Sequence, residues 1–311
     1  EHFSHSGRYE RAEEFVDVIK GLFDTWDDNA FIGDKESGRW FDASRIRQLN
    51  HKGKYFQVRG PLNAPRPIQG RPVFAQAGSS SSGLKLGARV GEVIFTAATT
   101  LEEAKAFRAE IRRRAELDYG RDPDSLVVMP GVGVTVAQTK QAAERKFDKS
   151  HLLKDPKTTL KALSEFIGLG IDLSTLPLDE IPKLPDAMPP TDRHRSRQKL
   201  VTDLIRREQP TLRQLLRLLS FGGHRVLIGS THDVANNFEE WFREGAADGF
   251  NIMTIQTPEA ISDFVELVVP ELHRRNLLKT TDTGKTLRES VGLARPVAHF
   301  PEAYSLLYVL D

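Results

Sequence analysis

Four short apolar segments constrain the fold more than any other feature of this chain. They are RPVFAQAG (71–78), GEVIFTAAT (91–99), LVVMPGVGVTVA (126–137) and DGFNIMTI (248–255), and a stretch with helical periodicity follows each of them. Strands buried on both faces lose the usual alternation of apolar and polar residues. Repeated strand–helix units build a parallel sheet with crossover helices. The sequence therefore predicts an α/β fold with four principal βα units, whose strands lie near 72–77, 93–98, 127–136 and 249–254.

Apolar residues at helical spacing define the other elements. They predict helices over 8–26, 84–90, 101–119, 139–153, 231–246 and 258–276. Two insertions interrupt this pattern. Residues 27–71 carry short strands such as KYFQVRG (54–60), and residues 138–225 are helical and rich in proline, with helices over 193–209 and from Thr211. Within HRVLIGS (224–230), VLIG indicates one more short strand.

Composition excludes several classes of protein. Lys+Arg 44 against Asp+Glu 43 leaves a net charge of +1, which gives no electrostatic reason to expect nucleic acid or an anionic membrane as a partner. No apolar run approaches the roughly 20 residues that span a bilayer. The chain has no cysteine, which excludes disulfides, thiolate nucleophiles and cysteine-bound metals and fits a cytoplasmic location.

Other candidate centres are weak. The histidines are scattered without metal-ligand spacing, and no G-x-S-x-G turn supports a serine nucleophile. His224 in GGHRV is as readily a turn or cap residue as a ligand. The basic cluster of Arg193, His194, Arg195, Arg197 and Lys199 is interpreted as a solvated patch around a helix start.

The strongest local signal is the turn after the first apolar strand. Gly78 is followed by four serines, Ser79 to Ser82, then by Gly83 and a helix. Backbone N–H groups at a helix N-terminus, with hydroxyl groups beside them, bind phosphate oxygens. Serine is also a common helix cap and a common linker residue, so a simple cap or connector remains the alternative.

A second cluster precedes the first helix. Tyr9 is able to hydrogen-bond a ligand, and His5 is able to serve as an acid or a polar contact. Arg8 lies between them. One histidine and one tyrosine have no diagnostic spacing, so the residues alone favour a helix cap with surface side chains.

Seven segments together resemble one family, in order from about residue 5 to residue 296. They are RYERAEEFVDVIKGLFDTW, LNHKGKYFQVRGPLNAPRPIQGRPVFAQAGSS, EVIFTA, MPGVGV, GHRVLIGS, EEWFREGAADGFNIM and VELVVPELHRRNLL. The family is that of the two-component FMN-dependent monooxygenases typified by nitrilotriacetate monooxygenase, dibenzothiophene-sulfone monooxygenase and pristinamycin synthase, which are similar in fold to bacterial luciferase.

The resemblance implies a TIM barrel with insertions, a homo-oligomeric state, and a separate NAD(P)H:flavin reductase that supplies reduced FMN. It further implies that reduced FMN reacts with O2 to give a C4a-peroxyflavin, which oxygenates a small organic substrate, in some cases with cleavage of a C–N or C–S bond. The cofactor then carries the chemistry, while the protein orients it and excludes water.

The resemblance also assigns site residues by position. His5 and Tyr9 match the family's H-x-x-x-Y flavin contacts, and Gly78, Ser79 and Ser80 match the A-G-S-S turn that holds the FMN phosphate. Phe95 and Ala97 fall where the family shapes its substrate pocket, and Phe221 is expected to close that pocket from the insertion. No residue is assigned catalytic acid or base work, and no metal is expected.

The chain departs from the family pattern at both ends. Only four of eight βα units are expected, which predicts the C-terminal half of a (β/α)8 barrel within a single domain, 1–311, from a truncated or split gene. Open strand edges would then be exposed. The tail 297–311 is atypical, and its apolar residues are expected to cover such an edge: Tyr304, Leu306, Leu307, Tyr308 and Leu310.

Two rival interpretations remain at this point. One is a non-catalytic half-barrel, a fragment or partner subunit that needs a complementing N-terminal half. The other is a coenzyme F420-dependent reductase of the same wider superfamily, which the FMN-subgroup motifs make less favoured. The sequence does not identify the substrate.

Overall fold

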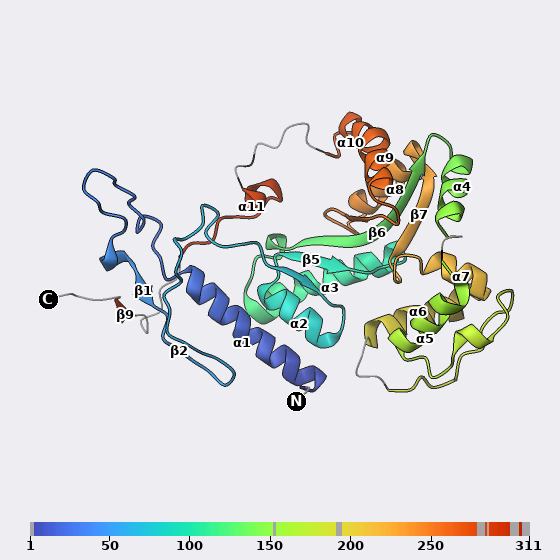
Figure 1. The fold of residues 1–311 in the computed structure, drawn as a ribbon, viewed down its shortest axis with the longest axis horizontal. Coiled ribbons are helices and arrows are strands. Elements are labelled where there is room, and N and C mark those ends of the chain that lie inside the picture. The colour runs from blue at the N-terminus through green and yellow to red at the C-terminus, as the bar shows by residue number, and fades with distance from the viewer. Residues whose placement is uncertain are drawn as a thin grey trace. The chain divides into compact units, whose positions relative to one another are not determined.

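The computed structural model describes residues 3–151, 154–190, 195–278, 284, 286–298 and 305–306. Contacts divide the chain into two compact units, one formed by Glu1–Phe74 with Asp282–Asp311 and the other by Ala75–Thr281 (Figure 1). The interpretation of residues 1–311 as a single domain stays a prediction. Within the described residues, no helix is long and apolar enough to cross a membrane.

A parallel sheet forms the centre of the larger unit. Its strands are β4 (Ala75–Ala77), β5 (Val93–Thr96), β6 (Val127–Ala137), β7 (Arg225–Ser230) and β8 (Asn251–Met253), in the order β4-β5-β6-β7 with β8 also paired to β6. Every pairing in this sheet is parallel. The four predicted strands and their parallel arrangement are confirmed. The strand predicted at VLIG is also present, and it is longer than expected.

β6 holds the sheet together because its eleven residues pair with three other strands. Its first part, Val127 to Pro130, pairs with β5, and Gly131 to Gly133 pair with β8. Val132 to Ala137 pair with β7. The apolar run that predicted this strand is long because β6 has neighbours along its whole length.

The helices of the larger unit follow the strands. They are α2 (Ser81–Val90), α3 (Leu101–Tyr119), α4 (Lys140–His151), α8 (Thr231–Arg243), α9 (Glu259–Asp263), a π-helical turn (Phe264–Val268) and α10 (Val269–Arg274). The bounds of α3 match the prediction. A capping box between Thr100 and Glu103 starts this helix, and Gly120 ends it with φ 60°, a left-handed conformation that glycine adopts without a steric cost.

Alternate residues of β6 face opposite sides of the sheet. The even-numbered residues are apolar and pack on helices: Val128 lies in a cluster with Ile111 and Ala115 of α3, whereas Val132 and Val134 pack with residues of α8 and the segment 264–272. Burial of each such side chain stabilises the fold by about 1.5–3 kcal/mol. The odd-numbered residues Gly131 and Gly133 therefore lie on the sheet face away from these helices.

The helical insertion has a hydrophobic core of its own. It contains α5 (Pro156–Ile167), a 3-10 turn (Leu173–Thr175), α6 (Arg195–Glu208) and α7 (Leu212–Leu218), which group together in Figure 1. Its buried residues are Leu160, Ile167, Leu169, Leu173, Val201, Leu204, Ile205, Leu212, Leu215 and Leu219. The prediction located α6 and α7 but not α5, although Asp155 caps that helix and Pro156 occupies its first position.

The smaller unit is built around α1 (His5–Phe23). It also contains a 3-10 turn (Ala43–Arg45), β1 (Arg47–Gln48), β2 (His51–Lys52), β3 (Gln57–Val58), α11 (Leu287–Ser290) and β9 (Ser305–Leu306). Glu14 of α1 accepts hydrogen bonds from the backbone N–H groups of Tyr55 and Phe56 and contacts His51 Nε2 at 3.0 Å. One carboxylate thus fastens the β2–β3 hairpin to the helix.

The apolar tail was expected to cover a strand edge. Residues 305–306 do pair antiparallel with β1 inside the smaller unit, with Arg47 opposite Leu306. The remaining tail residues of that prediction, Tyr304, Leu307, Tyr308 and Leu310, lie outside the described residues.

Candidate functional site

Two glycines of β6 determine what lies on the open face of the sheet. A Cβ atom at Gly133 would lie 2.0 Å from the Phe221 ring, and one at Gly131 would lie 2.4 Å from His224 Nδ1 and 2.8 Å from the Phe95 ring. Carbon atoms in ordinary contact stay about 3.5–4.0 Å apart. Only glycine at these positions allows the rings of Phe221 and His224 to rest against the strand backbone.

Phe221 and His224 both belong to the turn between α7 and β7. Gly222 and Gly223 have φ angles of 63° and 85°, which reverse the chain between Phe221 and His224. Both aromatic side chains are buried. His224 stacks on Phe95 of β5, with ring centroids 4.9 Å apart and an interplanar angle of 26°.

Arg197 of α6 completes this cluster. Its Nη2 lies 2.6 Å from His224 Nε2. Burial, followed by the neighbouring Arg197 charge, lowers the pKa of His224 to about 4, so the ring is neutral at pH 7. A neutral ring accepts the Nη2–H bond at Nε2, which leaves the ring proton on Nδ1, the nitrogen that faces Gly131.

The guanidinium of Arg197 is only partly paired. Burial alone lowers its pKa, and among the described residues no carboxylate forms an ion pair with it. Its Nη1 atom is buried and has no hydrogen-bond partner there. An arginine remains protonated in proteins, so a half-buried positive charge with a buried, unused donor lies at this site.

A cavity of about 180 Å³ opens at the carboxyl ends of β4 and β5. It is lined by Ala77, Gly78, Ser79, Phe95, Thr96, Ala97, Arg197, Leu200 and His224. Ligands of parallel α/β folds bind at this end of the strands. Four of the predicted site residues, Gly78, Ser79, Phe95 and Ala97, therefore lie around one cavity.

A second cavity, of about 510 Å³, shares Arg197 and His224 with the first. Its lining is Lys154, Phe166, Arg197, Ser220, Phe221, Gly222, His224, Met253, Thr254 and Ile255. Phe221 thus lies where the insertion meets the carboxyl end of β8. Among the described residues that line either cavity, none is acidic.

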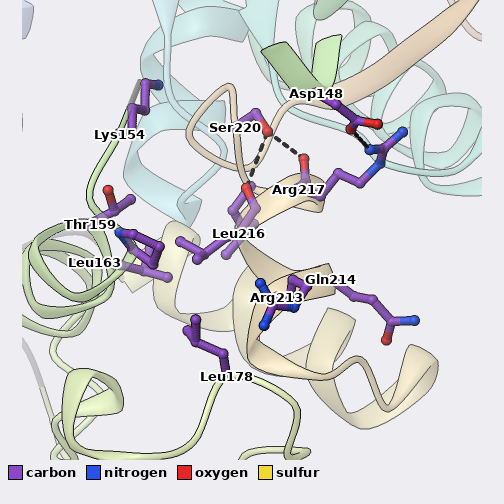
Figure 2. Close-up of a pocket in the computed structure, with 12 residues that line it drawn as sticks. Asp148, Lys154, Thr159, Leu163, Leu178, Arg213, Gln214, Leu216, Arg217 and Ser220 are labelled. Atoms are coloured by element: carbon purple, nitrogen blue, oxygen red, sulfur yellow. Dashed lines mark hydrogen bonds and ion pairs between the residues drawn. The ribbon is translucent and has the colours of Figure 1, made fainter. Parts of the chain in front are cut away.

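A third cavity, of about 490 Å³, lies within the helical insertion and is shown in Figure 2. Leu163, Leu178 and Leu216 give it an apolar lining. Its arginines are neutralised by neighbours: Arg217 pairs with Asp148 and Glu144, and Arg213 pairs with Asp179. Both arginines of its described lining are therefore paired, and Lys154 lines this cavity as well as the second one.

The other predicted residues have simpler settings. The Ser80 hydroxyl caps α2 by accepting a hydrogen bond from the Gly83 N–H at 3.1 Å, as the capping alternative proposed. His5 is the first residue of α1 and Tyr9 lies one turn further on, in the smaller unit. Their roles as flavin contacts, like those assigned to the Gly78–Ser80 turn, stay predictions.

One site residue was misjudged from the sequence. Arg197 was assigned to a solvated basic patch, which is wrong for this residue because its side chain is enclosed beside His224. Lys199 does fit that interpretation, since it is exposed and pairs with Asp203. Arg193 and His194, and the side chain of Arg195, lie outside the described residues. One signal was available: Arg197 precedes Val201 and Leu204 at helical spacing, on the face of α6 that is buried.

Comparison with known proteins gives a consistent result. The family description Luciferase-like monooxygenase matches residues 2–248. The chain is 44% identical to N-acetyl-S-(2-succino)cysteine monooxygenase of Bacillus subtilis over 96% of this chain and 67% of the relative. It is 45% identical to nitrilotriacetate monooxygenase component A of Aminobacter aminovorans over 95% of this chain and 64% of the relative.

Solved structures agree with the sequence matches. The crystal structure of DmoA from Hyphomicrobium sulfonivorans superimposes with a TM-score of 0.80 at 31% identity, covering 94% of this chain and 60% of DmoA. The chain thus spans about two thirds of the length of the relatives it matches.

Proposed function

This chain belongs to the luciferase-like monooxygenase family, and from that premise we propose that it forms the part of an FMN-dependent monooxygenase that binds the FMN phosphate and closes the substrate pocket. The observation that carries the proposal is the cavity at the carboxyl ends of β4 and β5. Gly78 and Ser79 of the turn that the family resemblance assigns to the FMN phosphate line this cavity together with Phe95 and Ala97, two of the three residues assigned to the substrate pocket. The third, Phe221, lines the second cavity.

The residues at the turn fit a phosphate group. Gly78 and Ser79 line the cavity directly before α2, a ten-residue helix with no acidic residue in its first turn. The N–H groups of a helix N-terminus favour an anion, and a serine hydroxyl adds a donor. Because the cavity holds about 180 Å³, it suits the phosphate end of FMN. His5 and Tyr9 are the proposed contacts for the rest of the flavin.

Reduced FMN, when bound, supplies the reaction with O2 that gives an oxygenating species. The residues of this chain exclude water and shape the substrate space. Phe95, His224 and Phe221 close the open face of the sheet with stacked or buried rings, and Ala97 keeps the neighbouring space small. The neutral His224 holds Arg197 and does not offer a proton at pH 7.

The proposed reaction is oxygenation of a small organic substrate, with C–N or C–S cleavage in some substrates. The relatives are named for acting on nitrilotriacetate and on a succinylated cysteine derivative. A separate NAD(P)H:flavin reductase is the proposed source of reduced FMN, because one relative is named as component A of its enzyme. A cytoplasmic location and a homo-oligomeric state are part of the same proposal.

The described sheet has an open edge at β4, and a (β/α)8 barrel needs more strands than this sheet contains. We infer that further βα units complete the barrel, either in additional sequence of the same protein or in a complementing chain. A purely non-catalytic half-barrel is less favoured, because Gly78, Ser79, Phe95 and Ala97 line one cavity with Arg197.

Calorimetric titration of the chain with FMN and with riboflavin tests the phosphate site. We expect FMN to bind more tightly than riboflavin, which lacks the phosphate, and Ser79→Ala to reduce that difference several-fold. Ser82→Ala is the matched control, because it removes a hydroxyl from the same helix away from the cavity lining. A folded chain, verified by circular dichroism, that binds neither compound would refute the proposal, as would an FMN preference that Ser79→Ala leaves unchanged.

A further inference from the structure

The cavity between the insertion and β8 has positive side chains without negative ones. Arg197 and Lys154 both line it, and none of its described lining residues is an aspartate or glutamate. The cavity of Figure 2 differs, because acidic neighbours neutralise its arginines. A charge taken out of water is strongly disfavoured unless it is paired. Among the described residues, the Arg197 guanidinium therefore has no anionic partner, and a ligand is able to supply one.

The two terminal nitrogens of Arg197 have different surroundings. Nη2 is held by His224 Nε2 at 2.6 Å, whereas Nη1 is buried without a partner among the described residues. A Cβ atom at Gly223 would lie 3.2 Å from this Nη1 atom, which places it beside the glycine turn that borders the second cavity. Guanidinium groups bind carboxylates and phosphates through paired N–H groups.

We propose that Arg197 binds an oxyanion group of the substrate in the cavity of about 510 Å³, that His224 positions Arg197, and that the substrate therefore carries at least one carboxylate or comparable anionic group. Lys154, which also lines this cavity, adds a second positive charge for a substrate with two such groups. This inference rests on the proposed function, since it describes the substrate of the same site.

His224 acts through Arg197. Its ring is wedged between Phe95 and the backbone of Gly131, so it has one orientation and offers one acceptor. An acceptor at this point fixes the guanidinium plane without neutralising its charge, which a carboxylate would do. The arrangement keeps the full positive charge available for a ligand.

The test uses the FMN-loaded protein and two matched probes, succinate and its neutral analogue succinamide. We expect succinate to bind at least tenfold more tightly than succinamide in the wild-type protein, and Arg197→Gln to abolish this preference. Arg206→Gln is the matched control, because Arg206 lies on the same helix and is exposed. For the positioning role, His224→Gln retains an acceptor and should preserve the preference for succinate, whereas His224→Leu should lose it.

Separate titrations with FMN and riboflavin distinguish the two sources of an oxyanion. If Arg197→Gln leaves succinate binding intact but removes the preference for FMN over riboflavin, Arg197 binds the flavin phosphate and the substrate assignment is wrong. The assignment also fails if the wild-type protein binds FMN yet binds succinate no more tightly than succinamide. A wild-type protein that does not bind FMN refutes the proposed function itself, whatever succinate does.

Discussion

Adding one methyl group at Gly133 is the sharpest perturbation of this site. In Gly133→Ala, the new Cβ would lie 2.0–2.3 Å from three atoms of the Phe221 ring, far inside contact distance. The ring is 7% exposed and has little room to withdraw. Either the ring leaves its position or β6 shifts away from the turn that carries Phe221 and His224.

Two opposing contributions determine how much Gly133→Ala changes the free energy of unfolding. Overpacking a core typically costs about 1–3 kcal/mol. Replacing a strand glycine with alanine otherwise gains about 0.5–1 kcal/mol by reducing the freedom of the unfolded chain. We therefore expect Gly133→Ala to lower the free energy of unfolding by about 1–2 kcal/mol.

A double-mutant cycle isolates the contact. Phe221→Ala alone should cost about 3–5 kcal/mol, because it removes a buried aromatic ring. In the Phe221→Ala background, Gly133→Ala has no ring to displace and should be neutral or slightly stabilising. The coupling between the two substitutions is then about 2 kcal/mol. Urea unfolding monitored by far-ultraviolet circular dichroism measures all four proteins, with the slope of each transition checked for constancy. Additive effects, or a stabilised Gly133→Ala single variant, would refute the close-packing argument.

Three further predictions concern other contacts of the larger unit. His224 has a pKa of about 4 in the folded protein and about 6.5 in the unfolded chain, so the unfolded chain binds a proton first as the pH falls. The free energy of unfolding should therefore drop by up to about 3 kcal/mol between pH 6.5 and pH 4. Urea titrations of His224→Gln should lack this drop. Asp248→Asn should cost about 3 kcal/mol in the same unfolding assay, because its carboxylate pairs with Arg108 and Arg112 and accepts the Val128 N–H. Ser80→Ala should raise amide exchange in the first turn of α2 and cost about 1 kcal/mol through loss of the cap; unchanged exchange there would argue against the cap.

Local signals in the sequence predicted the elements of the fold. α3 has the predicted bounds because Thr100 and Glu103 form a capping box and Gly120 takes a left-handed conformation, all within a few residues. The strands β5 and β6 were found because burial on both faces requires continuous apolar sequence. α5 was missed where the chain is rich in proline, although its own cap and first-turn proline were present.

The candidate site was only partly accessible to the same analysis. The Gly78–Ser79 turn was singled out by its strand–glycine–serine–helix pattern and Phe95 by the family resemblance, and both line the first cavity. Arg197 and His224 are 27 residues apart and meet only through the fold of the insertion. No local pattern reports such a contact, so a basic run and an isolated histidine were interpreted separately. Whether Arg197 and His224 meet depends on how α6 and α7 pack on the sheet.

The two glycines of β6 connect these observations. Because Gly131 and Gly133 have no side chain, the turn from the insertion lies directly on the strand. The rings of Phe221 and His224 fill the space that side chains of β6 would otherwise occupy. The position of His224, and through it that of Arg197, is thus set by the absence of two methyl groups on β6. Substitution of either glycine should therefore weaken anion binding and stability together. Arg197→Gln should weaken anion binding and leave the unfolding free energy nearly unchanged or raised, because it removes a half-buried charge that has no carboxylate partner among the described residues.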